Sequence, residues 1–372
     1  SAAERPGKKL ILVQLAGGND GLNTLVPFGD NEYRKRRPAI RIADDQLIRV
    51  DDRLGLHPSL APLEPLWSSK QLAVVQGVGY PNPNLSHFTS MHIWQTGDPS
   101  GKLLGGWLGR YLDEVEAQSH DPFTGFRVGT SAPAELTTGN TRVLAVNNPD
   151  IYRPVLSGPD AAHRQEALLK LYESYPTSAP YAALLETSID EAIEVSGKVR
   201  AAATSYVPAV KYPETPFGSG LQLLASIIAS GQPLRVGHIT LGGFDTHAKE
   251  GPEHGELLKT LAEGLAAFQA DIEAHGQADD VLVVTWSEFG RRVEENASGG
   301  TDHGTAAPLF VLGKQVHGGL YGDTVSLTQL DDNRNLRYTT DFRRVYATII
   351  ERWLDAAASP ILGAPFEQLG FV

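Results

Sequence analysis

The sequence predicts an α/β protein in which a mostly parallel sheet is covered by helices on both faces. Short continuous apolar runs, such as Lys9–Leu15 and Asp280–Trp286, recur along the chain, and this pattern is typical of strands buried on both faces. Helical patterns separate these runs, as the crossover connections of a parallel sheet require. The 372 residues, of which 41% are hydrophobic, suffice for one large core. We therefore expect a single domain over residues 1–372.

Two strands and a helix are expected near the start of the chain. The run Lys9–Leu15 ends at two glycines, so Asn19 and Asp20 follow the C-terminal end of this strand. Gln71–Val78 repeats the apolar pattern and leads into a loop rich in Pro and Asn. From His87 to Gln95 the sequence is typical of a helix.

The middle of the chain, residues 100–230, has a different character. It mixes the helical stretches 160–174 and 181–199 with a segment rich in Gly and Thr at 123–148. No cluster of acids and histidines follows a strand here. We therefore interpret residues 100–230 as an inserted helical cap with a small irregular β portion.

The second half returns to strands separated by a helix. Arg235–Leu241 is a third strand, and a long amphipathic helix follows it, with one apolar stripe of side chains at spacings of three and four: Leu258, Leu261, Leu265, Phe268 and Ile272. Asp280–Trp286 and Pro308–Leu312 are the fourth and fifth strands. Such sheets place ligands beyond the carboxyl ends of their strands, so functional residues are expected there.

Composition excludes several function classes. The chain has no cysteine, so thiolate metal sites, thiol nucleophiles and disulfides are all excluded. The net charge of −12 gives no broad attraction to nucleic acid or anionic lipid, and no apolar run has the roughly 18 residues of a membrane span. The basic run Arg34–Arg37 is a local exception, either a solvated loop or a rim that attracts anions.

The first residue is not a methionine, and we expect this end to be processed or trimmed. A removed export signal is compatible with such a start, and a periplasmic or secreted location is the expectation.

Acids and histidines gather after the later strands. Asp245 and His247 are two residues apart after the third strand, while Glu288, Asp302 and His303 follow or flank the fourth and fifth. Carboxylate and imidazole together suit Zn²⁺, Mn²⁺ or Fe²⁺. Asp-x-His alone is more often an Asx turn beside a packed histidine than a metal site, but several ionisable groups at one sheet edge are costly without a counter-charge. The clusters therefore predict a divalent-metal site.

The motifs resemble a known family. The string from Gly242-Gly-Phe-Asp-Thr-His through Ser287-Glu-Phe-Gly-Arg to Gly300-Thr-Asp-His-Gly, with Gly17-Gly-Asn-Asp-Gly-Leu-Asn near the start, is similar to the bacterial exported family called domain of unknown function 1501. This family resembles the alkaline-phosphatase superfamily, which includes the sulfatases. The resemblance spans nearly the whole chain and implies an alkaline-phosphatase-like three-layer sandwich.

The resemblance also implies two metal ions. The first, Zn or Mn, would be held by Asp245, His247 and His303. The second, Mg or Ca, would be held by Asp20 with the acids described in the next paragraph.

One departure from the superfamily pattern concerns this second ion. Phe289 follows Glu288, where the superfamily usually carries a histidine ligand. Glu288 and Asp302 would then hold the ion jointly with Asp20, or the ion is weakly bound or absent.

The resemblance further implies a Ser or Thr nucleophile, and Ser86 is the best placed because it stands at the start of a helix after the second strand. Alternatively, Ser86 or Asn84 is simply the N-cap of the helix that begins at His87. His87, next to Ser86, could point into the site. These residues are the candidate catalytic group, together with Arg291.

Arg291 could clamp phosphate or sulfate oxygens, or form an ion pair with Glu288 or Glu294. Asn19 and Asn23 could donate to a substrate oxyanion or close the glycine-rich turn.

The predicted function is therefore a metal-dependent hydrolase of phosphate or sulfate esters, acting on a small-molecule or glycan ester. The alternative is a non-catalytic exported binding or assembly protein on a degenerate alkaline-phosphatase fold, because one fold supports many functions. No nucleic-acid partner is expected.

Overall fold

A computed structural model describes residues 7–115, 121–147 and 182–372, together with the single positions 160, 163 and 170. Its centre is one sheet with the strand order β13-β5-β12-β9-β1-β8-β6-β7, in which β14 also pairs with β5. The strands of this sheet are β1 (Lys9–Ala16), β5 (Leu72–Gly79), β6 (Gly125–Val128), β7 (Leu144–Val146), β8 (Val236–Gly242), β9 (Val281–Trp286), β12 (Ala307–Leu312), β13 (Gly319–Tyr321) and β14 (Thr340–Asp341).

The sheet is mostly parallel, as predicted. β1 pairs in parallel with both β8 and β9, and β6 continues the parallel order beyond β8. The expected strand at Pro308–Leu312 exists as β12, but it runs antiparallel to its neighbours β5 and β9. The reason is the preceding hairpin of β10 (Arg291–Glu295) and β11 (Thr301–His303), which follows the end of β9. Since the hairpin leaves the chain at the carboxyl edge, β12 has to run back across the sheet.

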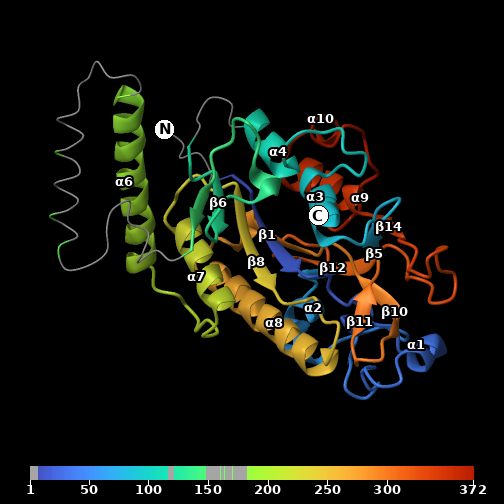
Figure 1. Cartoon of the computed structure of the whole chain (residues 1–372). Helices are drawn as coiled ribbons and strands as arrows, with labels where there is room; N and C mark the ends of the chain where they lie inside the picture. The colour runs from blue at the N-terminus through green and yellow to red at the C-terminus, as the bar shows by residue number, and fades with distance from the viewer. Residues whose placement is uncertain (1–6, 116–120, 148–159, 161–162, 164–169, 171–181) are drawn as a thin grey trace.

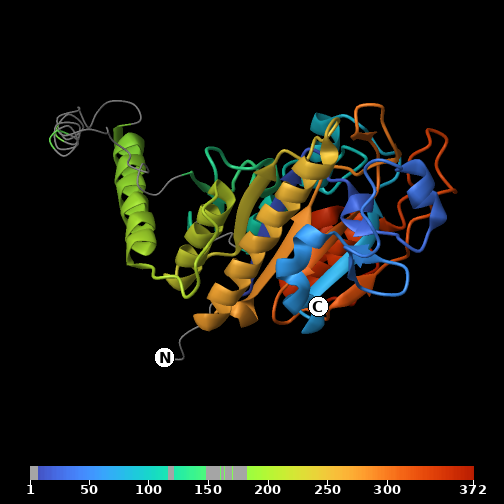
Figure 2. The same ribbon diagram turned by 90° about the horizontal axis from the view of Figure 1, so that it is seen from below.

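Helices cover both faces of the sheet (Figures 1 and 2). On one face lie α7 (Pro216–Ala229), α8 (Glu250–Ala274) and the short helices η2 (Pro58–Leu63) and α2 (Glu64–Ser68). On the other lie α3 (His87–Thr96), α4 (Trp107–Val115), α9 (Phe342–Thr348), η5 (Ile349–Trp353) and α10 (Ala358–Leu362). The architecture is therefore a three-layer α/β sandwich.

The alternation of side chains along β1 explains the two cores. Ile11 and Val13 pack into the core under α7 and α8, whereas Leu10 and Leu12 pack into the core under α4 and α9. All four are at most 1% exposed, as expected for a strand buried on both faces. The predicted stripe of α8 is buried as well, from Leu258 to Ile272.

The segment 100–230 contributes to the central sheet. β6 and β7 extend the sheet beyond β8, and α7 packs directly on α8. The helix expected at 181–199 is present as α6 (Ala182–Ser205), which lies beside α7 at one end of the molecule (Figure 1). The expected helix at 160–174 falls outside the described residues, apart from three isolated positions.

Smaller elements connect the main strands and helices. They are η1 (Gly21–Asn23), β2 (Leu25–Val26), α1 (Asn31–Arg36), β3 (Ile48–Arg49), β4 (Gly55–Leu56), η3 (Ala134–Leu136) and η4 (Ala278–Asp280). A third core cluster packs η1, β2 and α1 against the hairpin β10–β11, which contributes Val293. Among the helices that the structure describes, none has the length and apolar character to cross a bilayer.

Candidate metal centre

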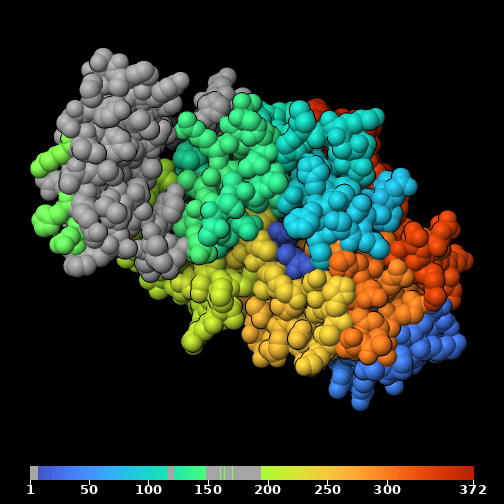
Figure 3. Space-filling view, in the orientation of Figure 1, coloured from blue at the N-terminus to red at the C-terminus, as the bar shows by residue number. Residues whose placement is uncertain are grey.

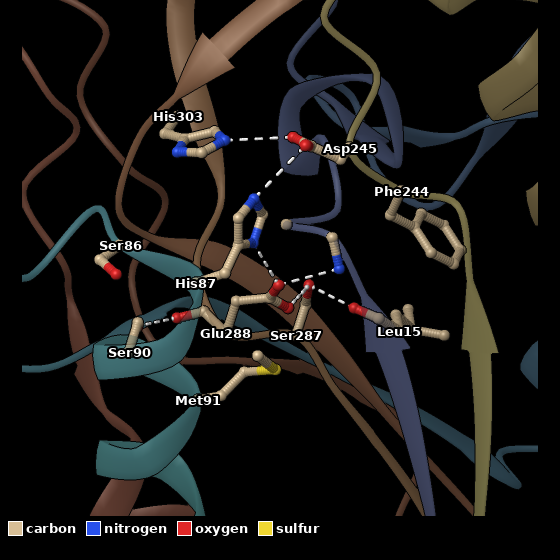
Figure 4. A network of polar contacts seen from close by, with 12 residues as sticks. Leu15, Ser86, His87, Ser90, Met91, Phe244, Asp245, Ser287, Glu288 and His303 are labelled. Atoms are coloured by element: carbon tan, nitrogen blue, oxygen red, sulfur yellow. Dashed lines mark hydrogen bonds and ion pairs between the residues drawn. The ribbon is translucent and has the colours of Figure 1, made fainter.

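The segments that follow four sheet strands meet at one edge of the sheet. Gly17 follows β1, His87 begins α3 after β5, Asp245 follows β8 and Glu288 follows β9. His303 reaches the same place from β11 (Figure 4). On the surface, the blue N-terminal part of the chain is visible between cyan, yellow and orange segments (Figure 3). Residues far apart in sequence therefore form one exposed site.

Three histidines surround the carboxylate of Asp245, and we call these four residues the open cluster. His303 Nε2 and His247 Nε2 lie 3.1 and 3.0 Å from Asp245 Oδ1, and His87 Nε2 lies 3.4 Å from Oδ2. In the described part of the chain, His87, Asp245 and His303 form a group whose potential ligand atoms all lie within 4.8 Å of one another. The structure thus brings Asp245 and His303 together as predicted and adds His87 as a third candidate ligand.

The second nitrogen of two of these rings fixes where the proton lies. His87 Nδ1 is 2.7 Å from Glu288 Oε1, and His303 Nδ1 is 2.8 Å from the carbonyl oxygen of Leu85. Both partners accept hydrogen bonds, so each Nδ1 carries the hydrogen. In a neutral imidazole the Nε2 lone pair is then free, and both lone pairs face the Asp245 carboxylate. Acceptors that face one another need a positive charge between them, and N, N and O ligands fit a divalent transition metal.

Asp245 itself is ionised. Burial alone would raise the pKa of Asp245, but the hydrogen bond and the positive charge of Arg291, together with the neighbouring His303, outweigh burial and lower the pKa to about 2. Its side chain remains 45% exposed, so an ion and a substrate can reach it from solvent.

His247 is the outer member of the open cluster. Its Nε2 lies 3.0 Å from His303 Nε2, and its side chain is 46% exposed. Its Nδ1 is 3.6 Å from Asp302 Oδ1. Asp302, predicted as a ligand of a second ion, therefore stands behind His247 on the solvent side.

Arg291 does not face a substrate, and this placement corrects the expectation that it clamps phosphate or sulfate oxygens. Its side chain has no exposed surface. It donates to Asp245 Oδ1 at 2.7 Å and to the backbone carbonyls of Gly18 and Phe244 at 2.7 and 3.0 Å. Its ion-pair partner is Asp245 rather than Glu288 or Glu294. Arg291 therefore fixes the loop that carries Asp245.

Glu288 and Phe289 support the histidines from inside. Glu288 is 1% exposed and accepts from the Gly17 backbone at 2.9 Å as well as from His87. The buried ring of Phe289 packs 4.8 Å from the ring of His87 and 4.6 Å from that of His303. Glu288 therefore orients a candidate ligand, and Phe289 holds the two imidazoles at a fixed spacing.

Asp20 lies away from the open cluster. It is fully buried and forms a two-point ion pair with Arg37, whose Nη2 is 2.9 Å from Asp20 Oδ1. Arg37 also donates to the carbonyl oxygens of Arg292 and Val293. Two expectations are corrected here. The positive charge beside Asp20 is a guanidinium instead of a second metal ion, and the last residue of the basic run is buried instead of solvated.

The acids expected around a second ion thus have separate partners. Asp20 pairs with Arg37, Glu288 with His87, and Asp302 contacts His247. The described residues contain no second group of three metal-ligating side chains. The open cluster is therefore the place for one ion.

The burial of Asn19 and Asn23 also corrects the expectation that these amides bind a substrate oxyanion. Each is 1% exposed. Asn19 Oδ1 accepts from His254 at 2.8 Å, and Asn23 donates to the Ile40 carbonyl at 3.0 Å. These amides close the turn after β1, which was the alternative to binding a substrate oxyanion.

A protein-family model identifies the family of this chain. The model described as Protein of unknown function (DUF1501) matches residues 7–357. The chain belongs to this family. A search of curated proteins finds no match to the DUF1501 chain.

Several solved structures are similar to the DUF1501 chain. Ps i-CgsB, crystallised in complex with k-i-k-neocarrahexaose, shares 12% identity at a TM-score of 0.42, covering 97% of this chain and 73% of its own. An alkaline phosphatase superfamily protein from Vibrio parahaemolyticus shares 9% at 0.39, covering 85% and 62%. The lipoteichoic acid synthase LtaP from Listeria monocytogenes shares 11% at 0.37, covering 97% and 73%. Similarities of this size assign no substrate to the DUF1501 chain.

Ser86 stands at the N-terminus of α3 beside His87 (Figure 4). It is exposed, and its side chain does not cap the helix. Asn84 accepts from the Ser86 backbone at 2.8 Å and so shapes the turn before the helix. The role of Ser86 as nucleophile stays a prediction.

A cavity of about 630 Å³ lies next to the open cluster of the DUF1501 chain. Leu85, Glu288 and Phe289 line it and also contact the open-cluster histidines. Its far wall is the loop 331–338, which brings carboxylate, amide and guanidinium groups, and Tyr80 and Trp94 line its inner part. This is a cleft of the size that small ligands occupy.

The sequence reasoning missed two features of the site. His87 was predicted as a catalytic group rather than a ligand, although its place at the end of the loop after β5 puts it at the same sheet edge as Asp245. The partnership of Asp20 with Arg37 was also missed. The signal for it was Arg37, the last residue of the basic run Arg34–Arg37, which stands at the C-cap of α1, a helix that the sequence analysis treated as a loop.

Proposed function

We propose that this chain is a metal-dependent hydrolase of phosphate or sulfate esters that uses one divalent ion, Zn or Mn, bound by His87, Asp245 and His303. The observation that supports it is the convergence of two free imidazole nitrogens and an ionised carboxylate at an exposed edge of the sheet. A bound ion at this place supplies Lewis-acid chemistry, lowering the pKa of a coordinated hydroxyl or water and binding an ester oxygen.

The chain prepares this site through the hydrogen bonds behind it. Glu288 and the Leu85 carbonyl keep a hydrogen on each Nδ1, so each Nε2 is available as a ligand. Arg291 keeps Asp245 ionised and holds its loop against β1. Phe289 excludes water from the inner side of the two rings.

The nucleophile in this proposal is Ser86. Its oxygen would form a bond to phosphorus or sulfur, the ester bond would break, and the alcohol would leave with a proton, after which water releases the acid. Ser86→Ala should leave folding and metal binding intact while lowering turnover by orders of magnitude. Activity within a few-fold of wild type would instead make a metal-bound water the nucleophile.

The alcohol part of the ester fits the cleft beside Phe289. Its polar lining, with Asn82, Asp332, Asn333 and Arg337, suits a small-molecule or glycan ester with several hydrogen-bonding groups. These side chains differ in charge and so favour no strongly anionic alcohol.

A second candidate function is a non-catalytic binding or assembly protein. The observation that favours it is the burial of Arg291, which leaves the site without the guanidinium expected to stabilise charge on a transferred group.

Metal analysis followed by an ester panel separates the two. Protein purified without chelator should contain close to one Zn or Mn, and aryl phosphates, phosphodiesters and sulfates should then be hydrolysed. A bound metal without turnover of any ester favours the binding protein, and the absence of any metal contradicts the proposed centre.

We also propose that the protein works outside the cytoplasm, since the motifs resemble an exported family. Fractionation of cells that express the full-length gene checks this, and recovery in the cytoplasm alone would contradict it.

A further inference from the structure

Behind the open cluster lies a second group of ionisable side chains, Asp20, Arg37, Glu250 and His254, which we call the buried cluster. Each is at most 1% exposed. Glu250 is the first residue of α8 and holds the hairpin β10–β11 at two points. Its Oε2 accepts from Thr301 Oγ1 at 2.6 Å, and its backbone N–H donates to the Gly299 carbonyl at 2.9 Å.

Thr301 connects Glu250 to the open cluster through its backbone hydrogen bonds. It begins β11, two residues before His303, and its backbone N–H donates to the Thr246 carbonyl at 3.2 Å. Its own carbonyl accepts from Arg291 at 3.0 Å. The packing is close, because a Cβ at Gly300 would lie 2.3 Å from the backbone of His247. A shift of Thr301 would therefore move His303 against the loop that carries Asp245 and His247.

The charges of the buried cluster balance only when Glu250 is neutral. Both oxygens of Asp20 receive bonds from Arg37, so these two charges compensate each other. His254 donates through Nε2 to Asn19, and its Nδ1 has no partner in the described part of the chain. Burial lowers the pKa of His254 to about 4, so it is neutral. An ionised Glu250 would thus be a second buried anion without a counter-charge.

Hydrogen bonding leads to the same conclusion. The carboxyl groups of Glu250 and Asp20 are close enough to interact, and two carboxyl groups can form a hydrogen bond with each other only if one carries the proton. Glu250 Oε1 is buried and receives no hydrogen bond from a donor in the described residues. The start of a helix favours a negative charge, but burial and the neighbouring Asp20 outweigh it and raise the pKa of Glu250 to about 9.

We propose that Glu250 is a neutral carboxylic acid in the folded protein, bridging to Asp20 through its proton and holding Thr301 through its other oxygen, so that it positions the hairpin that carries His303. The effect on His303 rests on the metal centre proposed above. The protonation of Glu250 does not.

Substitutions of Glu250 test the positioning role, with Zn²⁺ affinity measured by competition with a chelator. Glu250→Gln keeps one acceptor for Thr301 and offers N–H donors to Asp20, so its affinity should stay within about two-fold of wild type. Glu250→Ala should lower the affinity about ten-fold or more. Glu253→Gln, an exposed position on the same helix, is the matched control and should change nothing.

Two results would overturn the proposal. An equal loss of affinity in Glu250→Gln and Glu250→Ala would mean that Glu250 acts as an anion. Wild-type affinity in Glu250→Ala would mean that it positions nothing.

Infrared spectroscopy tests the proton without relying on the alanine variant or on any metal. At pH 7 the wild-type protein should show the C=O stretch of a buried protonated carboxylic acid, and this band should be missing in Glu250→Gln but present in Glu253→Gln. If the wild type binds no Zn²⁺ yet shows the band, the metal centre is wrong and the neutral Glu250 stands. A spectrum without the band overturns the neutral acid.

Discussion

The open cluster and the buried cluster use the same kinds of residue at the same edge of the sheet, yet they reach electrical balance in different ways. In the buried cluster Arg37 compensates Asp20, and a proton on Glu250 completes the balance without solvent. In the open cluster Arg291 pairs with Asp245, but two imidazole lone pairs face the same carboxylate, and the described residues place no further positive group between them. Acids and histidines therefore indicate a ligand site where their lone pairs converge at an exposed place, and not wherever a buried lone pair lacks a partner.

The largest effect is expected from breaking the ion pair of the buried cluster. Arg37→Met leaves Asp20 as a fully buried unpaired carboxylate, which should lower the free energy of unfolding by about 3–5 kcal/mol. Denaturant unfolding measures it. Arg34→Met is the control, because its ion pair with Asp44 is at the surface and should change stability by no more than about 1 kcal/mol. Equal effects of the two substitutions would show that Asp20 does not depend on Arg37.

The open cluster should respond to the loss of a ligand with a loss of metal rather than of fold. His303→Ala should lower Zn²⁺ affinity by at least about 100-fold and remove the rise in melting temperature that Zn²⁺ gives. Calorimetric titration and thermal melts measure the two effects. His317→Ala is the control, since the ring of this exposed histidine lies 3.2 Å from the Gly370 carbonyl oxygen and outside the open cluster. Unchanged metal content in His303→Ala would exclude the proposed centre.

A smaller effect on metal affinity is expected from a residue that orients a ligand without binding the ion. Glu288→Gln weakens the acceptor for His87 Nδ1, and such changes lower metal affinity by about 10–100-fold. The control is Glu294→Gln, an acid of the β10–β11 hairpin that pairs with Arg36 and Arg334 instead. If both variants bind Zn²⁺ like the wild type, Glu288 does not orient a ligand.

The smallest effect is the pH dependence of stability, measured with chelator present. Burial lowers the pKa of His57 and of His254 to about 4, so the folded protein resists protonating them, and stability should fall as the pH drops from about 6.5 towards 4. The contribution of Glu250 to stability changes with pH in the opposite direction. Its raised pKa of about 9 stabilises the fold below the unfolded value of 4.5, and this contribution is lost as the pH rises through 9.

Denaturation midpoints should therefore be highest near pH 6.5 and lower at pH 5 and pH 8.5. Glu250→Gln should flatten the change between pH 6.5 and pH 8.5, because its amide does not titrate. A stability that keeps rising up to pH 8.5 would contradict the neutral Glu250.

The fold was largely predictable because strands buried on both faces leave a local apolar pattern. Lys9–Leu15, Asp280–Trp286 and the stripe of α8 are examples, and the structure confirms all three. The direction of β12 was not predictable from its own residues, since it depends on where the β10–β11 hairpin leaves the chain.

The site also had a part that could be predicted from the sequence and a part that could not. Asp245 and His303 were predicted to share a centre because both follow strands at one edge, and they do lie together. Asp20 and Arg291 were misplaced, because their partners are set by tertiary contacts: Arg37 folds back from α1, and backbone carbonyls of the loops after β1 and β8 surround Arg291.

His87 and Asp245 stand on either side of a long stretch of the chain. A metal ion that joins them closes residues 88–244 into one loop, which includes α4, α7 and the last two strands at one end of the sheet, β6 and β7. Closing a long loop removes conformational entropy from the unfolded chain, as a disulfide does, provided the ion stays bound there. In a protein without cysteine, the ion would then be a reversible cross-link between the two halves of the sheet, and a chelator would loosen the edge that carries β6 and β7 before it loosens the centre.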